Sequence, residues 1–371
     1  GIMAGIYVHI PFCMQKCTYC DFASFPKEAD RQESYFACLY REMKGRSEQL
    51  KDRSFDTVYF GGGTPSFAQP AYIAGALKQI KKCFDLQKGA EITLEVNPAT
   101  LDGKKAEAYK AMGINRYSIG LQTGYDEELK RLNRPHTAKD FLITCNLLKG
   151  ENKSADILIG LHGQTEEMLL KTIDLALAGE VNHISMYALT PEVGTPIYTD
   201  YLNGELPGAD EVADLYDAGR KYLKEKGFYR YEVSNFARKG FESRHNMNYW
   251  KRGEYIGFGV AASSFIDERR FTNTFKFDEY INAVILNKFP EISSDDIGEE
   301  DRKFEFIMLA LRTERGLNVN EFNAKTGGDF FKDYAEALKK RRSVLDVSEY
   351  AVKIKEEFMY VQNEIILSFM K

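Results

Sequence analysis

The chain has 371 residues, so we expect one large domain and a smaller one. Its formal net charge of −5 argues against a protein that binds nucleic acid through a basic surface. No apolar run reaches the roughly 18 residues that a membrane-spanning helix needs. No signal peptide is recognised, so we expect a cytoplasmic protein.

Short strands alternate with helical stretches through the first half of the chain. The helices include Lys104–Met112 and Glu166–Ala178, whose apolar residues recur at spacings of three and four. Such βα units in series predict a parallel sheet with right-handed crossovers. An incomplete (β/α)6 barrel fits this pattern, and a flat doubly wound sheet is the alternative. The predicted strands are Ile6–Ile10, Thr57–Phe60, Glu91–Val96, Arg116–Ile119, Asp156–Ile159 and His183–Leu189.

The second half of the chain is less regular. We expect a barrel domain over residues 1–200, an extension over 201–290 and a small winged-helix-like domain over 301–371. The extension is predicted to contain a helix at Ala209–Lys226, a strand at Tyr229–Ser234, a loop at Asn235–Ala262, a strand or hairpin at Phe265–Thr272 and a helix at Phe277–Lys288. The acidic stretch Glu291–Glu300 is predicted to be a linker.

Three cysteines crowd the loop that follows the first predicted strand. Cys13, Cys17 and Cys20 have the spacing C-x3-C-x2-C. Three thiolates can bind three irons of a [4Fe-4S] cluster and leave the fourth iron without a protein ligand. That iron could chelate the amino and carboxylate groups of S-adenosylmethionine. The alternative is zinc, but a structural zinc site needs four ligands, and no second Cys/His pair accompanies this loop.

Polar or glycine residues also follow the other predicted strands. In a βα barrel the carboxyl ends of the strands meet at one mouth, where chemistry collects. Each residue singly could be a tight turn or a solvated surface charge, but together they predict one site beside the cysteine loop. The residues are the glycine loop Gly61-Gly62-Gly63-Thr64-Pro65, then Glu95, Gln122, Arg134 and Asp156, with Tyr187 and Ala188 as a flat surface for adenine.

These motifs resemble those of the radical S-adenosylmethionine (radical SAM) superfamily. More narrowly, the chain is similar to the oxygen-independent coproporphyrinogen III oxidase-like family. The matching segments are Y-x-H-I-P-F-C-x3-C-x-Y-C from Tyr7, the loop G-G-G-T-P, the segment Ser118–Gln122, the segment around Arg134, Tyr231–Ala237 and His245-Asn246-Met247-Asn248-Tyr249-Trp250.

The resemblance implies specific roles for residues of this chain. Cys13, Cys17 and Cys20 would bind the [4Fe-4S] cluster. Nine residues would contact S-adenosylmethionine: Tyr7, Tyr19, Gly62, Gly63, Thr64, Glu95, Gln122, Arg134 and Asp156.

Two branches of this family imply different functions. The oxidases carry an N-terminal arm and a further cysteine two residues after the third ligand, where this chain has Phe22. The HNxxYW motif instead resembles the haem chaperone HemW branch, with His245 as the expected axial haem ligand and Tyr249 and Trp250 stacked on the macrocycle. A structural histidine is the alternative for His245.

The leading hypothesis is therefore a haem chaperone that keeps a radical SAM site. Its expected partners are haem or a porphyrin and haem-acceptor proteins, membrane respiratory proteins among them, with the chain a monomer or a homodimer. The alternative is an enzyme that converts the propionates of coproporphyrinogen III to vinyl groups by oxidative decarboxylation. A third possibility is a radical SAM enzyme that acts on another tetrapyrrole.

Overall fold

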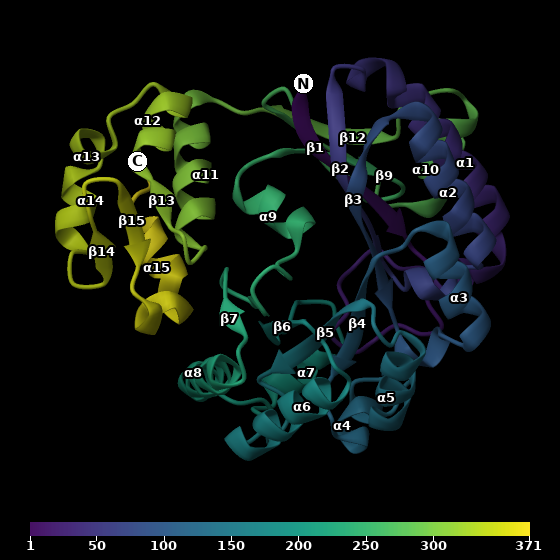
Figure 1. Ribbon diagram of the computed structural model, residues 1–371, viewed down its shortest axis with the longest axis horizontal. Helices are drawn as coiled ribbons and strands as arrows, with labels where there is room; N and C mark the ends of the chain where they lie inside the picture. Colours follow the sequence, from purple (N-terminus) through teal and green to yellow (C-terminus); the bar gives the residue numbers. More distant parts are fainter.

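Six parallel strands form the centre of the molecule (Figure 1). The computed structural model describes residues 1–371, and in it these strands lie side by side in the order of the chain. The predicted incomplete (β/α)6 barrel is confirmed. The strands are β1 (Ile2–Ile10), β2 (Arg53–Gly62), β3 (Asp85–Val96), β4 (Arg116–Gln122), β5 (Asn152–Ile159) and β6 (His183–Ala188).

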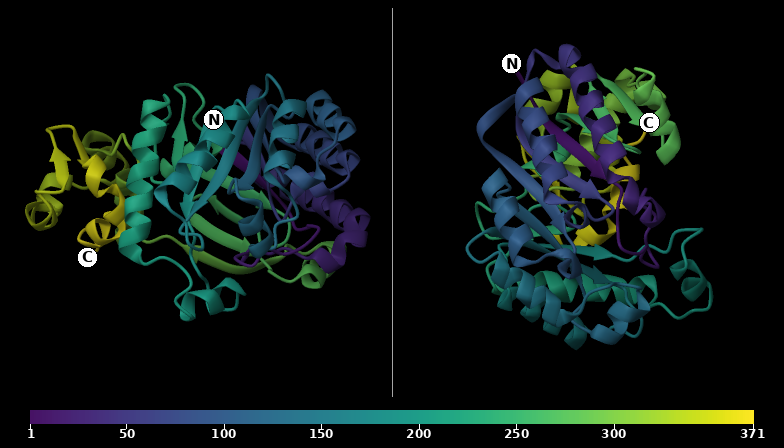
Figure 2. Two further views of the ribbon diagram at one scale, coloured as in Figure 1. Left: turned by 90° about the horizontal axis from the view of Figure 1, so that it is seen from below. Right: turned by 90° about the vertical axis from the view of Figure 1, so that its right-hand side faces the viewer.

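Helices connect these strands and cover one face of the sheet (Figures 1 and 2). Local signals fix their ends: the side chains of Asp102 and Thr165 accept hydrogen bonds from the first turns of α3 (Gly103–Met112) and α6 (Glu166–Ala178), and Gly113 ends α3 in the left-handed conformation. The helices are α1 (Gln32–Arg46), α2 (Pro70–Cys83), α3 (Gly103–Met112), α4 (Asp126–Arg131), α5 (Ala138–Leu147) and α6 (Glu166–Ala178). Short 3-10 helices lie at Pro26–Arg31, Ser47–Leu50, Pro65–Phe67, Pro98–Thr100 and Glu356–Val361.

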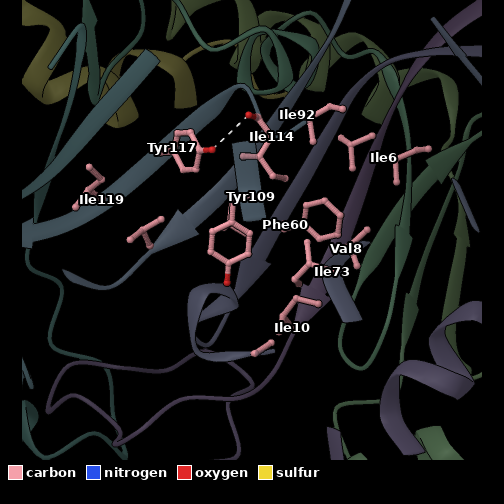
Figure 3. Packing of buried hydrophobic residues seen from close by; sticks show 14 of the residues in the cluster. Ile6, Val8, Ile10, Phe60, Ile73, Ile92, Tyr109, Ile114, Tyr117 and Ile119 are labelled. Atoms are coloured by element: carbon pink, nitrogen blue, oxygen red, sulfur yellow. Dashed lines mark hydrogen bonds between the residues drawn. The ribbon is translucent and has the colours of Figure 1, made fainter. Parts of the chain in front are cut away.

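The main hydrophobic core lies between the strands and these helices (Figure 3). Along β1, Ile6, Val8 and Ile10 are completely buried in it. Because side chains alternate across a strand, Tyr7 and His9 of β1 point to the opposite, inner face of the sheet. Packing thus uses one face and leaves the inner face free to carry polar groups.

The stretch Asn235–Ala262, predicted as a loop, is more ordered than expected. It contains β8 (Asn235–Ala237), α9 (Arg244–Trp250) and β9 (Glu254–Phe258). Strand β9 pairs in parallel with β1 and so extends the sheet beyond its first strand. Gly253 and Gly259 flank this five-residue strand and Gly257 lies within it, so the segment has the composition of a loop.

The predicted linker is also wrong in part, because Glu291–Asp296 forms the edge strand β12. It pairs with β11 (Arg269–Asn273) in a register that places Asp295 and Asp296 opposite Arg270 and Arg269. Arg269 also forms an ion pair with Glu291 of β12 at 2.6 Å, and opposite charges on paired strands favour such a pair. The acidic run thus lies beside a basic strand, a neighbour that its own sequence does not reveal.

Other elements complete the extension. Only Tyr229–Arg230 of the predicted strand Tyr229–Ser234 is extended, as β7, and the predicted hairpin is present as β10 and β11. These elements are α7 (Ile197–Leu202), α8 (Ala209–Glu225), β10 (Ser263–Ile266) and α10 (Phe277–Ile285). The whole sheet has the order β12-β11-β10-β9-β1-β2-β3-β4-β5-β6-β8-β7.

A C-terminal domain lies on the opposite side of the molecule from α1–α3 and packs against α8, where Arg220 forms an ion pair with Glu356 at 2.7 Å (Figures 1 and 2). It has its own hydrophobic cluster, built around Phe322, Phe330 and Val352. Its antiparallel sheet has the order β13 (Leu317–Asn318), β15 (Ala351–Ile354), β14 (Leu345–Val347). No helix of the structure is both long and apolar enough to span a bilayer. The domain's elements are α11 (Glu299–Leu311), β13 (Leu317–Asn318), α12 (Val319–Thr326), α13 (Phe330–Asp333), α14 (Ala335–Lys340), β14 (Leu345–Val347), β15 (Ala351–Ile354) and α15 (Gln362–Leu367).

One buried carboxylate ties α1 to the added strands. Glu42 accepts hydrogen bonds from the backbone N–H of Gly259 at 2.7 Å, from the side-chain amide of Asn273 at 2.8 Å and from the hydroxyl of Tyr280 at 2.9 Å. We expect Glu42→Leu to lower the free energy of unfolding by about 3–5 kcal/mol, because three buried donors lose their acceptor. Urea unfolding measures this change. Glu48→Leu, at an exposed position, is the control, and equal stability of the two variants would contradict the prediction.

Candidate functional site

The cysteine loop rests directly on the backbone of the glycine loop. The N–H of Gly63 donates to the carbonyl of Ile10 at 2.8 Å, and the N–H of Thr64 donates to that of Phe12 at 2.7 Å. A Cβ atom at position 63 would lie only 2.7 Å from the oxygen of Phe12. Gly62 also has a φ of 118°, which a residue with a side chain rarely adopts. The glycines therefore allow the two strand ends to touch.

The other side of the cysteine loop is held by segments from later in the chain. The N–H of Thr18 donates to the carbonyl of Leu132, and its carbonyl accepts from the N–H of Ile197, at 3.1 Å and 3.0 Å. The side-chain amide of Asn133 donates to the carbonyl of Lys16 at 2.8 Å. The loop is thus fixed by backbone contacts on both sides before any ligand binds.

A cavity of about 510 Å³ opens at this end of the sheet. Its volume lies in the ordinary range for small-molecule sites. Three cluster ligands, nine S-adenosylmethionine contacts and the axial haem ligand were predicted, and the wall brings together eleven of these thirteen residues: Cys13, Cys17, Tyr19, Cys20, Gly62, Gly63, Thr64, Glu95, Gln122, Arg134 and Asp156.

The three cysteines of the loop are free thiols on one side of this cavity. Burial raises the pKa of the Cys13 and Cys20 thiols. The lining contains no histidine and no fourth cysteine, so it does not supply the four ligands of a closed zinc site. The donor set fits a cluster that takes three protein thiolates and keeps one iron open.

Two half-buried carboxyl groups, Glu95 and Asp156, line the cavity. Burial raises the pKa of Glu95 to about 8, with a further contribution from Asp156. Burial likewise raises the pKa of Asp156 to about 6, although Arg116 opposes the shift. The hydroxyl of Ser118 lies 3.4 Å from both carboxylate oxygens of Asp156. Such a pair can accept hydrogen bonds from hydroxyl groups of a ligand and balance a positive charge on it.

Arg134 reaches the cavity between the cysteine loop and β4. Its guanidinium donates to the carbonyl of Gly120 at 2.9 Å and lies 3.5 Å from the sulfur of Cys17. Its Nε is buried without any hydrogen-bond partner. Buried polar atoms are normally paired, so this donor is suited to an acceptor on a bound molecule, such as a carboxylate.

Two predicted site residues lie elsewhere. Tyr7 lines a second cavity, of about 550 Å³, and not the first. His245 is only 1 % exposed and lines neither cavity. Its Nδ1 is hydrogen-bonded to Thr57 at 2.7 Å and its Nε2 to the hydroxyl of Tyr249 at 2.6 Å. Because both nitrogens are occupied, the predicted role of His245 as an axial haem ligand does not fit this geometry.

Three further residues of the cavity were not predicted as site residues. Arg116 and Ser185 come from the inner faces of β4 and β6, and Asn246 comes from α9. Arg116 is the first residue of β4 and is only 2 % exposed, and an arginine that opens a predicted strand was the one signal that the sequence offered for it. The sequence contains no such signal for Asn246, because this residue reaches the cavity only through the position of α9 in the fold.

The raised pKa of Glu95 makes the ligand-free protein less stable as the pH rises. The folded carboxyl has a pKa of about 8 and the ordinary value is 4.5, so the folded state holds the proton more tightly throughout this window. The free energy of unfolding therefore falls as the pH rises from 4.5 to about 8. We expect Glu95→Gln to remove the upper part of this slope in urea unfolding. Glu107→Gln, at an exposed position, should keep it, and an unchanged slope in Glu95→Gln would contradict this account.

Comparison with protein-family models supports the same site. The model of the radical SAM superfamily matches residues 7–176, which contain the cysteine loop, the glycine loop and both carboxyl groups. The model of the HemN C-terminal domain matches residues 297–343. A solved structure titled coproporphyrinogen III oxidase (HemN) from Escherichia coli, a radical SAM enzyme, superimposes with a TM-score of 0.88 over 100 % of this chain and 90 % of that one. At 21 % identity, this likeness shows the fold alone.

Curated relatives match almost from end to end. The haem chaperone HemW of Haemophilus influenzae is 32 % identical over 98 % of this chain and 91 % of its own length. The haem chaperone HemW of Bacillus subtilis is 30 % identical over 99 % of each chain. A bovine mitochondrial protein, radical S-adenosyl methionine domain-containing protein 1, is 35 % identical over 85 % of this chain and 74 % of its own. The chain therefore belongs to the radical SAM superfamily and, within it, to the family of the haem chaperone HemW.

Proposed function

We propose that this protein binds haem and delivers it to acceptor proteins, beside a [4Fe-4S] cluster that holds S-adenosylmethionine. The observation that carries this proposal is the near full-length similarity to relatives named as haem chaperones. The acceptors would be haem proteins, membrane respiratory proteins among them. All six cysteines are free thiols, which suits the reducing cytosol.

The residues of the first cavity fit the cluster and its ligand. Cys13, Cys17 and Cys20 would hold the cluster, which supplies an iron that chelates the methionine end of S-adenosylmethionine and can donate an electron. Arg134 has an unpaired donor beside the loop for the carboxylate of that ligand. Glu95 and Asp156 would meet its hydroxyl groups and balance its positive charge.

The chaperone proposal is tested against the oxidase alternative by one incubation. Anaerobically reconstituted protein is mixed with reductant, S-adenosylmethionine and coproporphyrinogen III, and the porphyrin products are separated. We expect tight haem binding in a parallel titration and no protoporphyrinogen. Stoichiometric protoporphyrinogen would overturn the chaperone proposal, and absence of haem binding would do the same.

We expect replacement of any one loop cysteine by serine to abolish the cluster. Serine removes one of three thiolates, and no other cysteine or histidine of the first cavity can replace it. Iron and sulfide content and the visible absorbance after anaerobic reconstitution measure the loss. Cys145→Ser, at a buried position in α5, is the matched control and should retain the full cluster. A full cluster in Cys17→Ser would contradict the assignment.

A further inference from the structure

The second cavity has the size and the walls that a flat, largely apolar ligand needs. Its volume is about 550 Å³, and most of its lining is aromatic or aliphatic. Tyr7 of β1, Tyr255 of β9 and Phe265 of β10 come from neighbouring strands, and Leu309 comes from α11 of the C-terminal domain. The cavity therefore lies where the sheet faces the C-terminal domain.

Tyr249 of α9 also lines this cavity and joins it to the buried His245. The two residues are four positions apart and so lie on the same face of the helix. The hydroxyl of Tyr249 lies 2.6 Å from Nε2 of His245, and the two rings pack edge to face at 4.8 Å. His245 is held in turn by Thr57 at 2.7 Å and stacks on Tyr59 at 5.2 Å.

From this arrangement, and resting on the proposed function, we propose that haem binds in the second cavity with its ferric iron on the phenolate oxygen of Tyr249. His245 is then a positioning residue and not the iron ligand. Phenolate is one of the axial ligands that proteins use for haem iron, as in catalase. Aromatic side chains on the walls can stack on the faces of the macrocycle.

When the oxygen of Tyr249 bonds to the iron, its O–H bond breaks and the proton leaves to solvent through the cavity. His245 stays neutral, in keeping with the burial and the nearby Arg116 that lower its pKa, and its Nε2–H donates to the phenolate. Nδ1 of His245 keeps its hydrogen bond to Thr57, so the ring does not need to move. The iron stays ferric, and no oxidant or reductant is consumed.

The second cavity, where haem is proposed to bind, shares a wall with the cavity of the cysteine loop. Asp21 and Phe22, directly after the last loop cysteine, line both cavities. A molecule in the second cavity would therefore touch the segment that leaves the cysteine loop. This contact gives haem binding a direct structural route to the cluster site.

The test is a ferric haem titration of the full-length protein, followed by absorbance, electron paramagnetic resonance and resonance Raman spectra. We expect the wild type to show the iron–phenolate vibration, and Tyr249→Phe to lose it and to bind haem about tenfold or more weakly. Tyr249→His should exchange phenolate for imidazole ligation. His245→Gln should keep the phenolate signal with reduced affinity, because the ligand remains but its positioning partner is lost. Tyr350→Phe, at an exposed position in the C-terminal domain, is the control for loss of a phenol elsewhere.

The outcomes separate this proposal from the proposed function. If the wild type binds haem but Tyr249→Phe keeps the wild-type spectrum and affinity, the ligand assignment is wrong and the chaperone proposal stands. Loss of ligation in His245→Gln with an unchanged Tyr249→Phe would make the histidine the ligand. Loss of the iron–phenolate signal in Tyr255→Phe alone would identify Tyr255 of β9 as the iron ligand in place of Tyr249. A wild type that binds no haem would overturn both proposals. Thermal unfolding and cluster content confirm that each variant is folded.

Discussion

The site depends on a direct contact between two pieces of backbone. The cysteine loop and the glycine loop follow adjacent parallel strands, and two hydrogen bonds, from Gly63 and Thr64, join them without any side chain between. No side chain fits at position 63, because its Cβ would collide with the carbonyl of Phe12. The three thiols are therefore placed by strand pairing in the centre of the sheet, the most constrained part of the fold.

The inner face of the sheet combines this rigidity with an unfavourable electrostatic arrangement. Glu95 and Asp156 are both half-buried and near each other, which disfavours ionisation of both at once. Without a ligand, such a pair of carboxyl groups lowers the free energy of unfolding. It can bind a positively charged ligand when one is present. The hydrophobic core on the other face of the sheet contributes the packing free energy that offsets this destabilisation.

Much of this could be predicted from the sequence, because the signals were local. The spacing of Cys13, Cys17 and Cys20 on one loop indicates the ligand set, and Gly62 and Gly63 mark where backbone must approach backbone. Strand ends of parallel units share one edge by topology, so Glu95, Gln122 and Asp156 could be brought to one mouth without knowing any distance.

What the sequence did not predict depends on contacts between distant segments. Strand β9 is short and flanked by glycines, and it exists because β1 offers a free edge. Strand β12 is acidic and pairs with β11, whose Arg269 forms an ion pair with Glu291. His245 belongs to a motif whose resemblance predicted a haem-iron ligand, but Thr57 and Tyr249 occupy both of its nitrogens. Pattern alone identifies a residue as special without showing which atom faces the cavity.

The wall that Asp21 and Phe22 form between the two cavities has a thermodynamic consequence. If a molecule in one cavity shifts this segment, it changes the affinity of the other cavity by some factor, and reciprocity requires the same factor in the opposite direction. A ligand bound tightly in the first cavity would then change the affinity of the second cavity for its own ligand. Release of one molecule would be governed by the presence of the other, with no chemical conversion of either.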